Sequence, residues 1–204
     1  MGRKALLEPI MTGELGYSLP PAVRRIANNF RLVGWLSFWV QIVSGVIATL
    51  LFVTSLLGLQ SVTNRGGAEN AAAGGGFLLA ALGLAAVYVG AFWAFQYTRF
   101  SRRLKSSNPD LRPKPKNAAK MVATGMTISV LGMFFGLLGA GGVVGALMLK
   151  VISQPQSNVA ITNPTLAVEP LDVFLVQSTV NTLISHFAGI VGSLWLSRTI
   201  NKQS

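Results

Sequence analysis

Four apolar segments, each long enough to cross a lipid bilayer, determine what this chain can fold into. They run from about 32 to 57, 75 to 97, 121 to 149 and 171 to 196. About 20 apolar residues suffice for a helix to cross the hydrocarbon core, and a helix satisfies all its backbone polar groups within its own segment. The sequence therefore predicts an all-α, polytopic membrane protein with four transmembrane helices.

The composition agrees with a membrane protein. Of 204 residues, 51% are hydrophobic and only 11% are charged, whereas soluble domains average about 25% charged residues. The formal net charge is +11, but the basic residues flank the apolar segments, so we expect no nucleic-acid partner. The chain has no cysteine, which excludes disulfides and thiolate metal sites.

The basic residues indicate the orientation of the helices. Five precede the first apolar segment, eight lie between the second and third, and two follow the fourth, which is fifteen of seventeen. Because cytoplasmic loops are enriched in Lys and Arg, both termini are expected on the cytoplasmic or stromal side (N-in/C-in). We expect this basic inner surface to attract anionic lipids or an acidic partner. Its central members are Arg99, Arg102, Arg103 and Lys105.

The charge and proline pattern divides the chain into three parts. Residues 1–31 form a basic N-terminal segment in which a short interfacial helix is expected after Pro20 and Pro21. Residues 32–198 form the membrane domain, and residues 199–204 form a tail.

The first and last apolar segments carry polar side chains at helical spacing. Gln177, Asn181 and Ser185 follow one another at steps of four, with His186 at the edge of their arc. We expect this stripe to meet Gln41 of the first segment, with Gln41 bonded to Asn181 or Gln177. The stripe is either an interhelical seam or the lining of a substrate path. A single imidazole does not make a metal site, since zinc usually takes four ligands.

The carboxylates lie outside the apolar segments. Glu169 and Asp172 stand at the outer mouth of the fourth segment, where they would attract a cation or favour the positive end of the helix. The sequence contains none of the established catalytic motifs. We therefore expect no enzymatic activity, no firm metal site and no resident cofactor, while bound lipid or pigment stays open.

The third apolar segment has small residues four apart, the spacing that lets membrane helices approach closely. A packing face of this kind is the simpler interpretation; the alternative is a helix break at Gly139–Gly142 that exposes carbonyl groups to an ion. The small residues are Gly125, Ser129, Gly132, Gly136, Gly141 and Gly145.

Several short motifs resemble one known family. The sequence LDVFLVQ at 171–177, followed by Asn181-Thr182-Leu183 and Ser185-His186-Phe187, is similar to the last span of the chloroplast inner-envelope translocon component that is also described as a plastid iron permease. Further matches are Phe38-Trp39 with Gln41, Phe92-Trp93 with Tyr97, and Leu131-Gly132-Met133. The resemblance extends over about 30–198.

This resemblance implies four helices in a plastid inner envelope or in a cyanobacterial plasma or thylakoid membrane. The N-terminus does not read as a transit peptide, so a cyanobacterial member is expected.

The family is linked to iron uptake and to protein translocation. The first hypothesis is therefore a permease for iron or another divalent cation, with iron as cargo. The second is a non-transporting translocon subunit, or an accessory or assembly subunit of a larger photosynthetic complex. A homo-oligomer or a larger membrane complex is expected.

Overall fold

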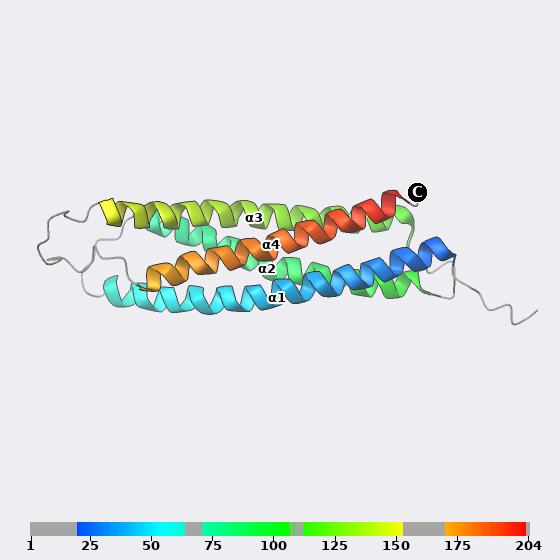
Figure 1. Ribbon diagram of the computed structural model, residues 1–204, viewed down its shortest axis with the longest axis horizontal. Helices are drawn as coiled ribbons and strands as arrows, with labels where there is room; N and C mark the ends of the chain where they lie inside the picture. Colours follow the sequence, from blue (N-terminus) through cyan, green and yellow to red (C-terminus); the bar gives the residue numbers. More distant parts are fainter. Residues whose placement is uncertain (1–19, 64–70, 107, 109–111, 153–169, 203–204) are drawn as a thin grey trace, which may run out of the picture.

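The part of the protein that the structure describes is a bundle of four long helices (Figure 1). The computed structural model describes residues 20–63, 71–106, 108, 112–152 and 170–202. Each helix is long and apolar enough to cross a membrane, which confirms the predicted all-α architecture with four spans. The helices are α1 (Pro21–Thr63), α2 (Ala71–Leu104), α3 (Pro115–Ile152) and α4 (Pro170–Asn201).

Prolines define where three of the helices begin. Pro21, Pro115 and Pro170 are the first residues of α1, α3 and α4, the position where a missing N–H costs no hydrogen bond and the fixed φ suits a helix. The separate interfacial helix expected after Pro21 does not form. No proline or glycine occurs from Ala22 to Val33, so the helix that starts at Pro21 continues into the first span.

The helices extend beyond the hydrocarbon region. α1 has 43 residues, which corresponds to roughly 65 Å at a rise of 1.5 Å per residue, whereas the hydrocarbon core is about 30 Å thick. The ends of the bundle therefore stand in the headgroup regions. The start of α1 and the ends of α2 and α4 meet at one end, which we call the basic end (Figure 1).

Each helix packs against two neighbours in a ring, α1 against α2 and α4, and α3 against α2 and α4. α2 and α4 also meet across the diagonal. The contact between α2 and α3 is close enough that a Cβ added to Gly83 would lie 2.9 Å from the Cα of Gly136. α3 is continuous through Gly139–Gly142, so the alternative interpretation of a helix break is wrong.

Two apolar clusters occupy the two ends of the bundle interior. The cluster at the basic end consists of Ala27, Phe30, Val33, Tyr97, Phe100, Leu104, Ala118, Val122, Leu196 and Ile200. The cluster towards the opposite end consists of Ala48, Phe52, Ala80, Leu84, Val143 and Leu175. Between them lies a set of buried polar side chains that we call the polar layer. Its members are Ser37, Gln41, Ser129, Ser185, His186 and Ser193.

Candidate functional site

α4 supplies two of the four serine hydroxyls of the polar layer, and a further buried hydroxyl close to it. Ser185, Ser193 and the neighbouring Thr182 are all at least 97% buried. Two of these hydroxyls bond within their own helix: Thr182 Oγ1 donates to the Ser178 carbonyl at 3.0 Å, and Ser185 Oγ donates to the Asn181 carbonyl at 3.1 Å. Bonded in this way, a small hydroxyl is compatible with a dry interior.

Other buried hydroxyls connect different helices. Ser178 Oγ donates to the Ala48 carbonyl of α1 at 2.8 Å, and Ser55 Oγ donates to the Leu171 carbonyl of α4 at 2.9 Å. At the basic end, Ser101 Oγ of α2 donates to the carbonyl of Ala27 at 2.6 Å. These bonds fix the register of α1 against α4 and α2.

The structure places the two amides of α4 differently from the sequence prediction. Gln177 is exposed on the outer surface of the bundle, and Asn181 is only partly buried. Asn181 Nδ2 donates to the Gln177 carbonyl at 3.0 Å. The expected bond from Gln41 to Asn181 or Gln177 is therefore wrong, because the buried face of α4 is centred on Ser178, Thr182 and Ser185, about 100° away from Gln177.

His186 is a fully enclosed member of the polar layer, only 1% exposed. Its Nε2–H donates to the Gly83 carbonyl of α2 at 3.0 Å. The ring lies directly over Gly132 of α3, where an added Cβ would overlap it. His186 thus connects α4, α2 and α3. No group of three or more potential metal ligands occurs among the described residues.

Gln41 lies at the centre of the bundle and is 3% exposed. Its amide lies beside Gly90 of α2 and Gly189 of α4, and none of the described residues makes a hydrogen bond to it. It lines a cavity of about 10 Å³ together with Ser37, Ser129 and Ser193, which is room for about one water molecule. The cavity is polar on several sides, so a water there would find partners.

Tyr97 and Ser193 are among the residues of this cavity that sequence reasoning missed. Tyr97 is 3% exposed and lines the cavity with its hydroxyl 3.4 Å from Ser193 Oγ. Ser193 was predictable, because it continues the spacing of Ser185 and Gly189 by another step of four. Tyr97 was not, since nothing in the sequence shows that α2 turns this ring away from the membrane interface.

Aromatic rings close the interior on both sides of the polar layer. At the basic end, the ring of Phe30 meets that of Tyr97 edge to face at 5.9 Å and that of Phe100 at 5.3 Å. Towards the other end, the ring centroids of Phe52 and Phe77 are 4.3 Å apart. The polar layer is therefore enclosed between apolar contacts.

Asp172, which the sequence suggested as a residue that attracts cations, forms an ion pair with a lysine in the structure. Asp172 lies in the first turn of α4, and its carboxylate accepts from Lys150 Nζ of α3 at 3.0 and 3.1 Å. The lysine neutralises this carboxylate, so Asp172 does not offer a free negative charge to a cation. Glu169 lies outside the described residues.

The remaining predicted residues divide into interior and surface groups. Gly125, Ser129, Gly132 and Gly136 are buried against other helices. Gly141 and Gly145 are exposed, and an added Cβ at either would meet nothing within 4 Å. Four basic residues are exposed at the basic end: Arg99, Arg102 and Arg103 in the last turns of α2, and Lys105 directly after it.

Comparison with known proteins finds a family model and a curated relative. Residues 20–201 match the family described as "Protein of unknown function (DUF3611)". The chain is also 34% identical over 182 residues to "Protein TIC 21, chloroplastic" of Arabidopsis thaliana, a match that covers 87% of this chain. The chain spans 58% of the length of that relative. No solved structure matches the chain.

Proposed function

The chain belongs to the DUF3611 family, and from that premise we propose that it is a non-conducting structural subunit of a larger membrane complex, of the translocon kind. The observation that carries this proposal is the filled axis of the bundle. Apolar clusters close both sides of a polar layer whose cavity measures about 10 Å³. A divalent cation that retains its water ligands needs room for several waters, which this packing does not leave.

The polar groups of the interior act, in this proposal, as connections between helices. Hydrogen bonds of this type contribute about 0.6 kcal/mol each on average in membrane proteins. Ser178, Ser101 and His186 each reach a backbone carbonyl of another helix. These hydrogen bonds between helices account for the buried polar groups without a transported substrate.

The outer surface supports assembly with other subunits. Gly141 and Gly145 lie one helical turn apart on the exposed face of α3 with open space above them, and small residues at this spacing let a neighbouring helix approach closely. In the proposed orientation the basic end faces the cytoplasm or stroma, in a cyanobacterial or plastid membrane.

Iron transport is the second candidate, and Gln41 favours it. An amide that is 3% exposed and lacks a hydrogen-bond partner among the described residues lies near the middle of the bundle, where transporters commonly place their binding sites. For transport through one chain, both apolar clusters would have to open in turn.

Uptake of labelled iron into proteoliposomes separates the two candidates. For a non-conducting subunit we expect uptake no higher than in protein-free vesicles. Saturable uptake that falls in Gln41→Leu but not in the matched control Gln177→Leu, an exposed amide, would instead identify a permease with Gln41 on its route.

Purification from native membranes in mild detergent tests the subunit proposal independently. We expect other proteins to co-purify with the chain in fixed proportion, and a Gly141→Leu, Gly145→Leu variant to lose them while it keeps its thermal stability. A chain that purifies alone or only as a homo-oligomer would contradict the proposal.

A further inference from the structure

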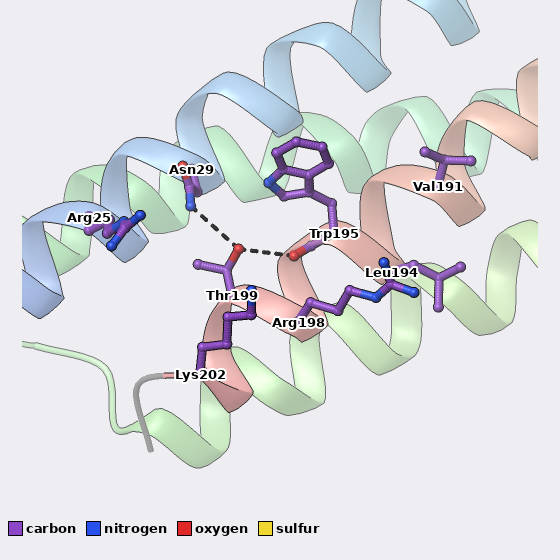
Figure 2. Close-up of a pocket in the computed structure, with 8 residues that line it drawn as sticks. All are labelled: Arg25, Asn29, Val191, Leu194, Trp195, Arg198, Thr199 and Lys202. Carbon is purple, nitrogen blue, oxygen red and sulfur yellow. Dashed lines mark hydrogen bonds between the residues drawn. The ribbon is translucent and has the colours of Figure 1, made fainter.

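A groove of about 770 Å³ lies between the start of α1 and the end of α4, at the basic end of the bundle (Figure 2). It is open to the surroundings on one side and is unrelated to the polar layer in the interior. Its lining residues are Arg25, Asn29, Val191, Leu194, Trp195, Arg198, Thr199 and Lys202.

Three cationic side chains surround the groove. Arg25 comes from α1, Arg198 from the last turn of α4, and Lys202 directly follows that helix. All three are exposed, and none forms an ion pair or a hydrogen bond with the described part of the chain. The described carboxylate, Asp172, belongs to the opposite end of the bundle. The groove therefore offers several N–H donors, and no carboxylate of the described residues compensates its positive charge.

The polar floor of the groove is held in place by two hydrogen bonds. Asn29 Nδ2 donates to Thr199 Oγ1 at 3.4 Å, and Thr199 Oγ1 donates to the Trp195 carbonyl at 3.0 Å (Figure 2). The first bond ties α1 to α4 at this level. Arg25 lies one turn before Asn29, and Lys202 lies three residues after Thr199, so this bond also joins the helix turns that carry these cations.

Apolar side chains continue the groove away from the charged end. Val191 and Leu194 are exposed on α4, and the indole of Trp195 is 60% exposed. From Val191 to Lys202 the groove follows roughly 16 Å of helix at 1.5 Å per residue. Trp favours the level of the lipid headgroups, so the cations would lie at that level and the aliphatic residues within the acyl-chain region.

We propose that this groove binds the phosphate headgroup of an anionic phospholipid, with an acyl chain along Val191 and Leu194. Guanidinium groups match phosphate oxygens in a bidentate geometry, and basic pockets between membrane helices are suited to anionic headgroups. A small free anion would use the cations but not the apolar strip. A bound lipid would stabilise the packing of α1 against α4 whichever of the two candidate functions applies.

Native mass spectrometry of the detergent-purified chain tests the proposal. Phosphatidylglycerol is compared with phosphatidylcholine that carries the same acyl chains. We expect phosphatidylglycerol to be retained at least about tenfold more strongly, because each basic residue near a headgroup adds to the attraction. A thermal-shift assay with the same two lipids provides a second measurement.

A pair of charge-matched variants locates the site. Arg25→Gln, Arg198→Gln, Lys202→Gln removes the three cations of the groove. The control Lys114→Gln, Lys116→Gln, Lys120→Gln removes three exposed cations elsewhere at the basic end, around the start of α3. We expect the first variant to lose the preference for phosphatidylglycerol and the control to keep it.

Three results would overturn the proposal. Equal losses in both variants would show attraction by net charge alone, and no loss in the groove variant would place the lipid elsewhere. Stabilisation by inorganic phosphate as large as that by phosphatidylglycerol at the same concentration would show a simple anion site without a role for the acyl chain.

Discussion

At the scale of single residues, the polar layer depends on large side chains that fit where glycines leave room. The ring of His186 occupies the space that a side chain at position 132 would fill, and it donates to the Gly83 carbonyl. Gly189 leaves room in the same way for Gln41 and the hydroxyl of Ser129. At Gly132 and Gly189, a buried polar side chain of a neighbouring helix packs directly against the glycine. A single added methyl group at either glycine should therefore destabilise the protein.

Gly132→Ala should destabilise the protein by about 1–3 kcal/mol, the usual cost of forcing extra atoms into a packed interior. The added Cβ would overlap the imidazole ring of His186. Thermal unfolding in detergent measures the effect. Gly141→Ala is the matched control in the same helix, and with nothing within 4 Å of its Cβ it should be neutral or stabilising by up to about 1 kcal/mol. Equal losses in the two variants would contradict this packing.

His186→Ala should reduce the cost of Gly132→Ala. The single histidine variant loses the bond to Gly83 and leaves a cavity, but the same cavity accepts the new methyl group. We expect the double variant to be more stable than additivity predicts by at least about 0.5 kcal/mol, as is usual for residues in contact. Strictly additive effects would show that the two residues do not touch.

At the scale of helices, the register of α1 against α4 determines which polar groups meet. Ser178 bonds to the Ala48 carbonyl, and Gln41 lies beside Gly189, more than two turns along α4 from Asn181. Small hydroxyls and glycines therefore occupy the contact, and the larger amides Gln177 and Asn181 lie towards its edge or outside it.

An ion pair joins α3 and α4 at the end opposite the basic end. Asp172→Asn and Lys150→Gln should each lower stability by about 0.2–1 kcal/mol, the range for partly exposed pairs; the two side chains are 14% and 30% exposed. Asp172→Asn should cost more, because the carboxylate also favours the first turn of α4. A double variant should lose little beyond Asp172→Asn alone, and fully additive losses in unfolding experiments would exclude coupling.

The sequence was sufficient to predict the helices but not how each one is rotated. Segment length and the lack of charge predict four transmembrane helices, because a chain in the hydrocarbon core must satisfy all its backbone hydrogen bonds internally. In α4, however, polar residues occur on several sides, and Gln177 and Ser178 differ by about 100° around the axis. Spacing alone favoured the amide stripe as the buried one. The structure buries the neighbouring hydroxyls, which bond within their own helix or to a nearby carbonyl.

At the scale of the whole molecule, the interior of the bundle is packed along its axis, and the features that we propose for binding lie on its outer surface. The apolar clusters enclose a polar layer with room for about one water. Outside, the exposed glycines of α3 and the cationic groove between α1 and α4 are available to a helix and a lipid. In the role that we propose, the protein acts through what it binds at its surface.

Thiol accessibility measures most directly whether the polar layer is a seam or a path. Because the chain has no cysteine, a single introduced thiol reports on one position only. Ser185→Cys and Ser129→Cys place thiols in the polar layer, where the native side chains are 0% and 3% exposed, and Asn117→Cys is an exposed control at the start of α3.

Proteoliposomes are treated with a membrane-impermeant thiol reagent from each side. We predict that Asn117→Cys reacts from one side and that neither interior cysteine reacts from either side. Reaction of Ser185→Cys or Ser129→Cys at a rate close to that of the control would show a water-filled path through the bundle and would contradict the account.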